Sequence, residues 1–162
     1  MGINATFMGM SLHLAQQDVP NKEYFQFCSD GEFHLQCCDK CDLLRYPPTT
    51  ACPWCAEAKS RWKRVPGTGT VHSFTVVHHA IQPGLKDHTP YAVLIVDLDT
   101  QNGSPSPEEA LRVVGNLTKK NGTLASAQEV SRIGIGTRVR MTFTSIAPGL
   151  ALPQWTTDFD CV

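Results

Sequence analysis

The hydrophobic positions in the second half of the chain recur with a period of two, which is typical of β-strands. Within residues 137–146, Val139, Met141 and Phe143 alternate with polar side chains. The stretch YAVLIVDLD at 91–99 is apolar almost throughout, which predicts a strand buried on both faces. Three further strands complete the predicted set: residues 67–79, residues 111–117 and a short one around Trp155.

One short helix is predicted before the last long strand. Ser126 and Glu129 have the spacing of a capping box, and the glycines of IGIG end the helix soon afterwards. A long polar loop, TQNGSPSPEEA at residues 100–110, connects two of the strands. This order of strands, glycine-marked bends and one helix predicts a small closed barrel of the OB type over residues 61–158.

The N-terminal part of the chain differs from this pattern. Residues 1–18 show no firm periodicity and are predicted to be a loosely held arm. A helix is predicted over residues 19–32, with Asn21 as its cap, Tyr24 and neighbouring aromatic residues on one side, and Gly31 at its end. The predicted fold is therefore mainly β, with an N-terminal helix.

Residues 33–60, between the helix and the barrel, hold five of the seven cysteines. Two C-x2-C pairs each bring two sulfurs within reach of one point, because a tight turn folds the short loop back on itself. Four thiolates in a tetrahedral shell suit Zn2+. The predicted ligands of a structural zinc ion are Cys38, Cys41, Cys52 and Cys55. This is the layout of a rubredoxin-like zinc ribbon.

Three alternatives to zinc stay open at this point. Iron fits the same shell of four sulfurs. A disulfide framework needs an oxidising compartment, and the N-terminal sequence does not read as an export signal. A thioredoxin-type redox pair at Cys52 and Cys55 would precede a long helix, which the following sequence does not predict. The other two cysteines, Cys28 and Cys161, are isolated and are interpreted as ordinary thiols.

The charge and hydropathy of the chain limit its partners. The formal net charge is −1, whereas dedicated nucleic-acid binders carry a clear basic excess. No run of 18 apolar residues is present, so we expect no membrane span and a cytoplasmic protein.

No catalytic residue is predicted. The histidines in or near the first barrel strand lack a carboxylate at ligand spacing, and strand alternation would send two neighbouring ones to opposite faces. These residues are interpreted as exposed or interface side chains: His72, His78, His79 and His88. The sequence also lacks a phosphate-binding glycine loop and a nucleophile elbow. Since protein fills all four predicted metal positions, the metal is expected to hold the shape of the ribbon rather than to react.

The segment KSRWKR at 59–64 places basic side chains around an indole. Cationic groups beside an aromatic face suit the phosphates and adenine of coenzyme A, or a contact with a partner enzyme. The same composition on an OB-fold suits single-stranded nucleic acid, and the simplest alternative is a solvated linker between ribbon and barrel, with Trp62 packed in the seam. The candidate contact residues are Arg61, Trp62, Lys63 and Arg64.

The order of these features resembles the DUF35 family, which is described as a rubredoxin-like zinc ribbon joined to an OB-fold and associated with acyl-CoA metabolism. The resemblance covers about residues 19–156 and includes LQCCDKCDLLRYPPTTACPWC, VPGTGTVHSFTVVH, PYAVLIVDLD and the terminal LPQW. Two features depart from the family pattern: Cys37 stands where an arginine is common, and the loop at 100–110 is longer than usual.

The resemblance implies an accessory subunit rather than a stand-alone enzyme. Family members are encoded beside, or bound to, thiolases, thiolase-like aldolases and enoyl-CoA hydratases. We therefore expect a hetero-oligomer in which this chain stabilises a thiolase-like enzyme that makes or breaks a carbon–carbon bond next to a CoA thioester. The CoA moiety would be held at or near the interface. The alternative function is an OB-fold protein that binds single-stranded nucleic acid.

Overall fold

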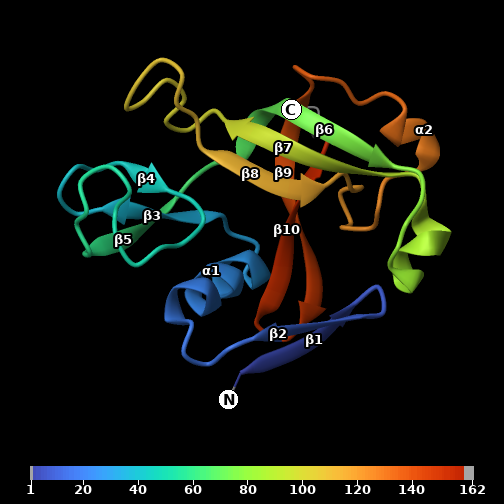
Figure 1. Ribbon diagram of the computed structural model, residues 1–162, viewed down its shortest axis with the longest axis horizontal. Helices are drawn as coiled ribbons and strands as arrows, with labels where there is room; N and C mark the ends of the chain where they lie inside the picture. The colour runs from blue at the N-terminus through green and yellow to red at the C-terminus, as the bar shows by residue number, and fades with distance from the viewer. Residues whose placement is uncertain (1, 159–162) are drawn as a thin grey trace.

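The alternating segments form one five-stranded antiparallel sheet in the computed structural model, which describes residues 2–158 (Figure 1). The strand order is β10-β9-β6-β7-β8. The five strands are β6 (Thr68–Val77), β7 (Tyr91–Leu98), β8 (Arg112–Asn116), β9 (Arg138–Ala147) and β10 (Leu150–Thr156). All five correspond to predicted strands, with small differences at their ends.

The sheet closes on itself where the end of β8 meets β10. Leu117 forms a parallel bridge with Trp155, and the backbone N–H of Asn116 donates to Oε1 of Gln154 at 2.6 Å. The sheet order together with this parallel contact gives the five-stranded barrel of an OB-fold. The predicted OB barrel is confirmed.

The short helix α2 (Ala127–Val130) precedes β9, as the sequence predicts. Its capping box is complete, because the hydroxyl of Ser126 accepts from the N–H of Glu129 and the Glu129 carboxylate accepts from the N–H of Ser126. The two hydrogen bonds fix where the chain turns back into the barrel.

Strand β7 corrects one expectation. Leu94, Val96 and Leu98 are buried, but Ile95 between them is 38% exposed. Burial on both faces was therefore the wrong prediction, because the curved wall of a barrel buries only its inner face. The outward-facing apolar residues of β7 lie on the surface.

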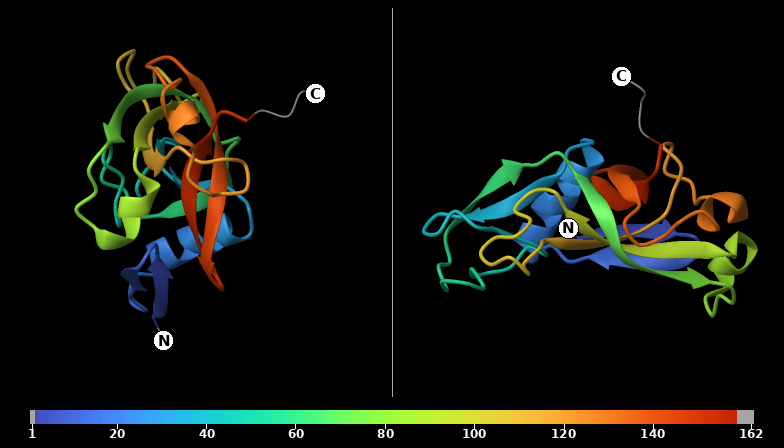
Figure 2. Two further views of the ribbon diagram at one scale, coloured as in Figure 1. Left: turned by 90° about the vertical axis from the view of Figure 1, so that its right-hand side faces the viewer. Right: turned by 90° about the horizontal axis from the view of Figure 1, so that it is seen from above.

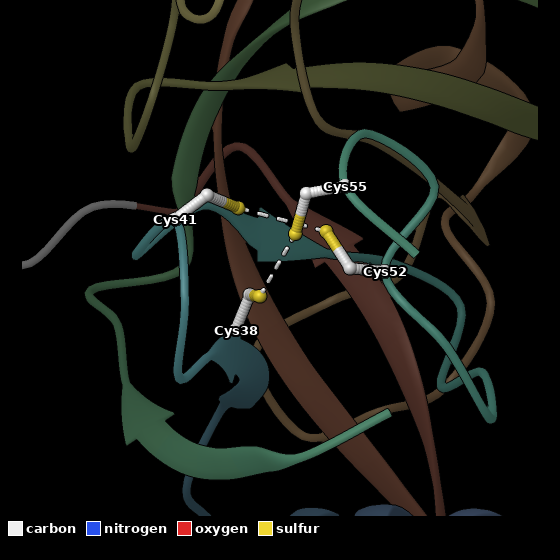
Figure 3. Close-up of side chains that lie close together, drawn as sticks. All are labelled: Cys38, Cys41, Cys52 and Cys55. Carbon is white, nitrogen blue, oxygen red and sulfur yellow. Dashed lines mark hydrogen bonds between the residues drawn. The ribbon is translucent and has the colours of Figure 1, made fainter. Parts of the chain in front are cut away.

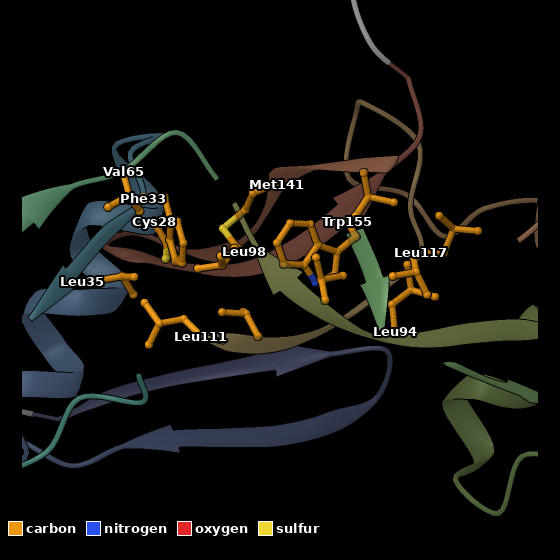
Figure 4. Close-up of a cluster of buried hydrophobic side chains, with 14 of the residues drawn as sticks. Cys28, Phe33, Leu35, Val65, Leu94, Leu98, Leu111, Leu117, Met141 and Trp155 are labelled. Atoms are coloured by element: carbon orange, nitrogen blue, oxygen red, sulfur yellow. The ribbon is translucent and has the colours of Figure 1, made fainter. Parts of the chain in front are cut away.

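The barrel core is continuous with the interior of the N-terminal half (Figure 4). Trp155 fills the centre of the barrel with none of its surface exposed, and Met141 lies beside it. The same cluster of buried side chains reaches Cys28 and Leu35, outside the barrel. The parts of the chain therefore share one hydrophobic core.

The N-terminal segment is a β-hairpin rather than an arm without regular structure, so that prediction was wrong. Strands β1 (Ile3–Phe7) and β2 (Met10–Leu14) pair in register. The turn residues Met8 and Gly9 both have positive φ, 49° and 75°, as a two-residue hairpin of matching twist requires. The hairpin lies along β9 at the lower edge of the molecule in Figure 1.

Helix α1 (Val19–Ser29) packs against β10 and β3 (His34–Cys38). Its cap is Asp18 rather than the predicted Asn21, because the Asp18 carboxylate accepts from the N–H of Asn21 at 3.3 Å. Cys28 on the inner face of α1 is fully buried, as predicted for an ordinary thiol; Cys161 lies outside the described residues.

The ribbon is a separate three-stranded sheet of order β4-β3-β5, formed by β3 (His34–Cys38), β4 (Leu44–Arg45) and β5 (Ser60–Arg64). It lies at one end of the barrel, beside α1 (Figures 1 and 2). Since β5 pairs with β3 as far as Arg64, the predicted division at residue 60 falls at the start of a ribbon strand.

The long loop after β7 contacts the ribbon. The side chain of Gln101 accepts from the N–H of Leu44 at 2.6 Å and donates to the carbonyl of Leu44 at 2.9 Å. Leu44 is 3% exposed, so these two bonds satisfy backbone groups at the junction of ribbon and barrel.

Replacing Gln101 by alanine is expected to lower the free energy of unfolding by about 1–3 kcal/mol, because both Leu44 groups lose their partner. Thermal unfolding measures this loss. Gln128→Ala on the exposed face of α2 is the matched control, with an expected change within about 0.5 kcal/mol. Equal unfolding midpoints for the two variants would show that Gln101 does not join ribbon to barrel.

Among residues 2–158, no helix is both long and apolar enough to cross a lipid bilayer.

Candidate metal centre

Two turns of the same geometry present the four predicted ligands. In the first, the N–H of Asp42 donates to the carbonyl of Cys38 at 3.1 Å; in the second, the N–H of Ala56 donates to the carbonyl of Cys52 at 2.9 Å. Asp42 and Ala56 each follow the second cysteine of a pair, and both are left-handed, with φ of 58° and 59°. The left-handed residue turns each loop back sharply, so that both sulfurs of a pair point the same way.

The four sulfurs converge on one point (Figure 3). Cys38 Sγ lies 3.5 Å from Cys55 Sγ, Cys41 Sγ lies 3.6 Å from Cys52 Sγ, and all four lie within 4.8 Å of one another. A tetrahedral zinc site with Zn–S bonds of about 2.3 Å requires S···S separations of about 3.8 Å. The residues therefore fit a structural metal such as zinc.

The ionisation of the thiols agrees with this interpretation. Burial raises the pKa of the Cys52 thiol. The backbone N–H groups of Trp54 and Cys55 lower it by a larger amount, so that the pKa is about 7. The N–H of Leu43 lowers the pKa of Cys41, but the neighbouring sulfurs raise it to about 12. Four crowded sulfurs cannot all ionise together unless a cation neutralises them.

The centre is suited to structure rather than chemistry. Protein sulfur fills every position of a tetrahedral shell, which leaves no place for a reacting water. Cys38 and Cys52 are buried, and Cys38 ends β3, the central strand of the ribbon. A bound metal would therefore hold two loops against the ribbon sheet.

Arg45 is a residue that sequence reasoning missed. It is 2% exposed, and it donates to Gln36 Oε1 at 2.9 Å and to Ser60 Oγ at 3.1 Å. Ser60 stands directly opposite Cys38 in the ribbon sheet. Within residues 2–158 Arg45 forms no ion pair, and a buried cation needs a countercharge. Four thiolates around one divalent ion would carry a net charge of about −2, which would place an anionic centre in the same ribbon as Arg45. No signal in a single sequence marks an arginine as buried.

Replacing Arg45 by glutamine is expected to speed the release of zinc to a chelating dye by about 10–100-fold, as for other residues that support metal ligands. The exposed Arg64 of the same sheet is the control, and Arg64→Gln should release zinc at the wild-type rate. If both variants match the wild type, Arg45 does not support the metal centre.

The four candidate CoA-contact residues lie on β5, where alternation divides them. Arg61 and Lys63 face one side of the ribbon sheet, and Trp62 and Arg64 face the other. Arg61 pairs with two carboxylates, including Asp39 at 3.0 Å. The four side chains therefore do not form a single basic face, and their contact with CoA stays a prediction.

Trp62 lies in a groove between β5 and α1. Its indole N–H donates to Glu23 Oε2 at 2.8 Å, and its ring meets the edge of Phe27 at a centroid distance of 5.4 Å. The groove has a volume of about 450 Å3. Trp62 is thus an anchored ribbon residue and not part of a free linker.

The histidines do not gather into a second metal site. Within residues 2–158, the four cysteines form the only group of three or more potential ligands close enough to share an ion. All four histidines are exposed, as predicted: His72 on β6, His78 and His79 after it, and His88 in the 3-10 helix η1 (Pro83–His88). His72 does have a carboxylate neighbour, Asp97 at 3.0 Å, which strand pairing supplies from 25 residues away.

Comparison with known proteins places the chain in a family. Residues 62–144, half of the chain, match the family of the ChsH2 C-terminal OB-fold domain. The chain is also similar to a chain in the solved structure of the Ltp2–ChsH2(DUF35) aldolase, with 29% identity, a TM-score of 0.65, and 84% of this chain aligned with 92% of that one. The chain belongs to the DUF35 family.

This DUF35 protein is similar to two further proteins, to one in fold alone and to the other in sequence. A DUF35-family protein of unknown function from Sulfolobus solfataricus has a TM-score of 0.52 at 13% identity, with 87% of each chain aligned, and this likeness concerns the fold alone. A protein of Thermomonospora curvata named as an enoyl-CoA hydratase alpha subunit is 29% identical over 133 residues, or 82% of this chain. The chain spans 36% of the length of that relative.

Proposed function

We propose that this DUF35 protein is a non-catalytic subunit of an acyl-CoA-processing complex and that it binds and stabilises a thiolase-like enzyme. The observation that carries the proposal is its likeness, over 84% of its length, to a chain of the Ltp2–ChsH2 aldolase structure. An aldolase makes or breaks carbon–carbon bonds, which agrees with the predicted type of partner. The name of the hydratase relative also concerns acyl-CoA.

The geometry of the metal centre favours a structural role over a catalytic one. The closed arrangement of four cysteines holds the ribbon and offers no open coordination position. The exposed histidines are not gathered around a pocket. The nucleophile and the acid–base residues would therefore belong to the enzyme subunit.

We also propose that CoA lies near the interface of the two subunits. Because β5 divides the candidate residues, the face that carries Trp62 and Arg64 beside α1 is the better contact of the two, since it includes an aromatic ring and a groove. Arg61 on the other face pairs with two carboxylates, and Arg64 pairs with one, that of Glu32 at 3.3 Å.

Affinity purification of the tagged chain from its native cells, followed by quantitative mass spectrometry, tests the proposal. We expect one enzyme that acts on acyl-CoA, of thiolase-like sequence, in near-stoichiometric amount. Recovery of single-stranded nucleic acid instead would favour the OB-fold alternative, and recovery of the chain alone would contradict both functions.

A further inference from the structure

The outer face of β7 and β8 carries an unusual set of exposed apolar side chains. Val114 is 53% exposed, Ile95 is 38% exposed, and Val93 points to the same side. In Figure 1 these strands lie in front of β9 and β10, and no helix or strand of the described chain lies over them. The second and third strands of an OB barrel, here β7 and β8, are the usual ligand-binding face of this fold.

Two hollows adjoin on this face and share Val93 and Val114 as a common wall. The smaller, of about 180 Å3, is lined by Ser73, Phe74, Thr75, Val93, Ile95 and Val114. The larger, of about 300 Å3, lies where β8 and β10 meet α1 and the ribbon, with Tyr24, Phe25 and Tyr46 among its walls. The apolar surface therefore continues from β6 to the ribbon.

The charges at the border of this face are paired within the chain. Asp97 lies 2.9 Å from Arg112 Nε and 3.0 Å from His72 Nδ1. On the next row, both carboxylate oxygens of Asp99 bond to Arg138 at 2.6 Å. These two arginines have their carboxylates already, so the face does not offer them to phosphate groups. A partner surface that is complementary to this face of β7 and β8 is therefore uncharged.

We propose that the outer face of β7 and β8 is the docking surface for the enzyme subunit, an inference that rests on the proposed function. The complementary surface is an uncharged protein face from which one large aliphatic or aromatic side chain projects into the smaller hollow. A volume of 180 Å3 equals about six water molecules at roughly 30 Å3 each, which suits one such side chain and is too small for a cofactor. Buried anchors of this type dominate protein–protein affinity.

Val114→Glu is the decisive variant, because it places a carboxylate at the wall shared by both hollows. We expect the dissociation constant for the purified enzyme subunit to rise by at least about 30-fold, since an unpaired charge would be buried at the centre of the interface. Ile135→Glu is the control: Ile135, in the turn before β9, is 75% exposed and lines neither hollow. Its dissociation constant should stay within about twofold of the wild type.

Two further measurements keep the test independent of misfolding. Val114→Thr preserves the shape and strand preference of the side chain and should weaken binding by a smaller, measurable factor of about 3–10. Hydrogen exchange of the wild-type complex should slow in residues 91–98 and 112–116. Unchanged affinity of a folded Val114→Glu variant, or protection confined to α1 and β5, would overturn the docking surface while leaving the proposed function intact.

Failure of the proposed function gives a different result. In that case the wild-type chain recovers no enzyme subunit, and the docking proposal falls with it. Sedimentation of the isolated chain then identifies the remaining occupant: a wild-type dimer that Val114→Glu converts to a monomer would assign this face to a second copy of the chain.

Discussion

Replacement of Cys52 by serine is expected to remove the bound metal and to lower the midpoint of thermal unfolding by about 10–20 °C. Cys52 is buried, and its sulfur lies 3.6 Å from that of Cys41. Serine offers a poorer ligand for zinc, so the two loops would lose the ion that joins them. A loss of about 5 kcal/mol corresponds to this shift for a chain of this length, at about 2–4 °C for each kcal/mol.

Cys37→Ser is the matched control for this prediction. Cys37 is also buried and precedes Cys38, but its sulfur points to the carbonyl of Asp42. Metal analysis should find one zinc per chain in the wild type and in Cys37→Ser, and much less in Cys52→Ser. A Cys52→Ser protein that retains one zinc would rule out the assigned ligand set, and iron in the wild type would correct the identity of the metal.

Replacement of Trp155 by alanine is expected to lower the free energy of unfolding by about 3–5 kcal/mol, because it opens a large cavity in the barrel. The indole fills the space beside Gly115, where an added Cβ would come within 3.0 Å of the ring. The backbone carbonyl of Trp155 also accepts from Thr118 at the seam between β8 and β10. Chemical denaturation followed by circular dichroism measures the effect.

Trp54→Ala provides the comparison, because Trp54 is 36% exposed between the two cysteines of the second pair. Its loss should cost less, about 1–2 kcal/mol, since part of the ring is already in water and its removal leaves no closed cavity. A cost for Trp155→Ala as small as that for Trp54→Ala would mean that the barrel does not depend on this seam.

The barrel could be predicted from the sequence because its strands alternate and its turns carry glycine. Val139 and Met141 are buried and Phe143 packs against the core, as the alternation indicates. The hairpin of residues 3–14 was missed although its apolar residues also alternate. Its two strands have only five residues each, and the Met8-Gly9 turn between them lacks the Asn-Gly or Asp-Gly pair that marks a hairpin in sequence. The burial of β7 was overestimated because an apolar run cannot reveal which face a curved sheet turns outward.

The metal centre was predictable from spacing, whereas its surroundings were not. Two C-x2-C pairs bring sulfurs together by local turns alone. The pairing of Arg45 with Gln36 and the contact between Gln101 and Leu44 depend on strand pairing and on loop docking, which one sequence does not specify. The division of Arg61 and Trp62 between two faces follows from β5 being a strand, whereas the sequence left this segment open between a contact site and a linker.

The most direct test of the accessory role is an enzyme assay. It measures the rate at which the recovered enzyme subunit converts its acyl-CoA substrate as increasing amounts of this chain are added. We expect no turnover by the chain alone, little by the enzyme subunit alone, and a saturable increase when the two are combined. The increase should be smaller at a given concentration of Val114→Glu. An enzyme subunit that is stable and fully active without this chain, or turnover by the isolated chain, would contradict the accessory role.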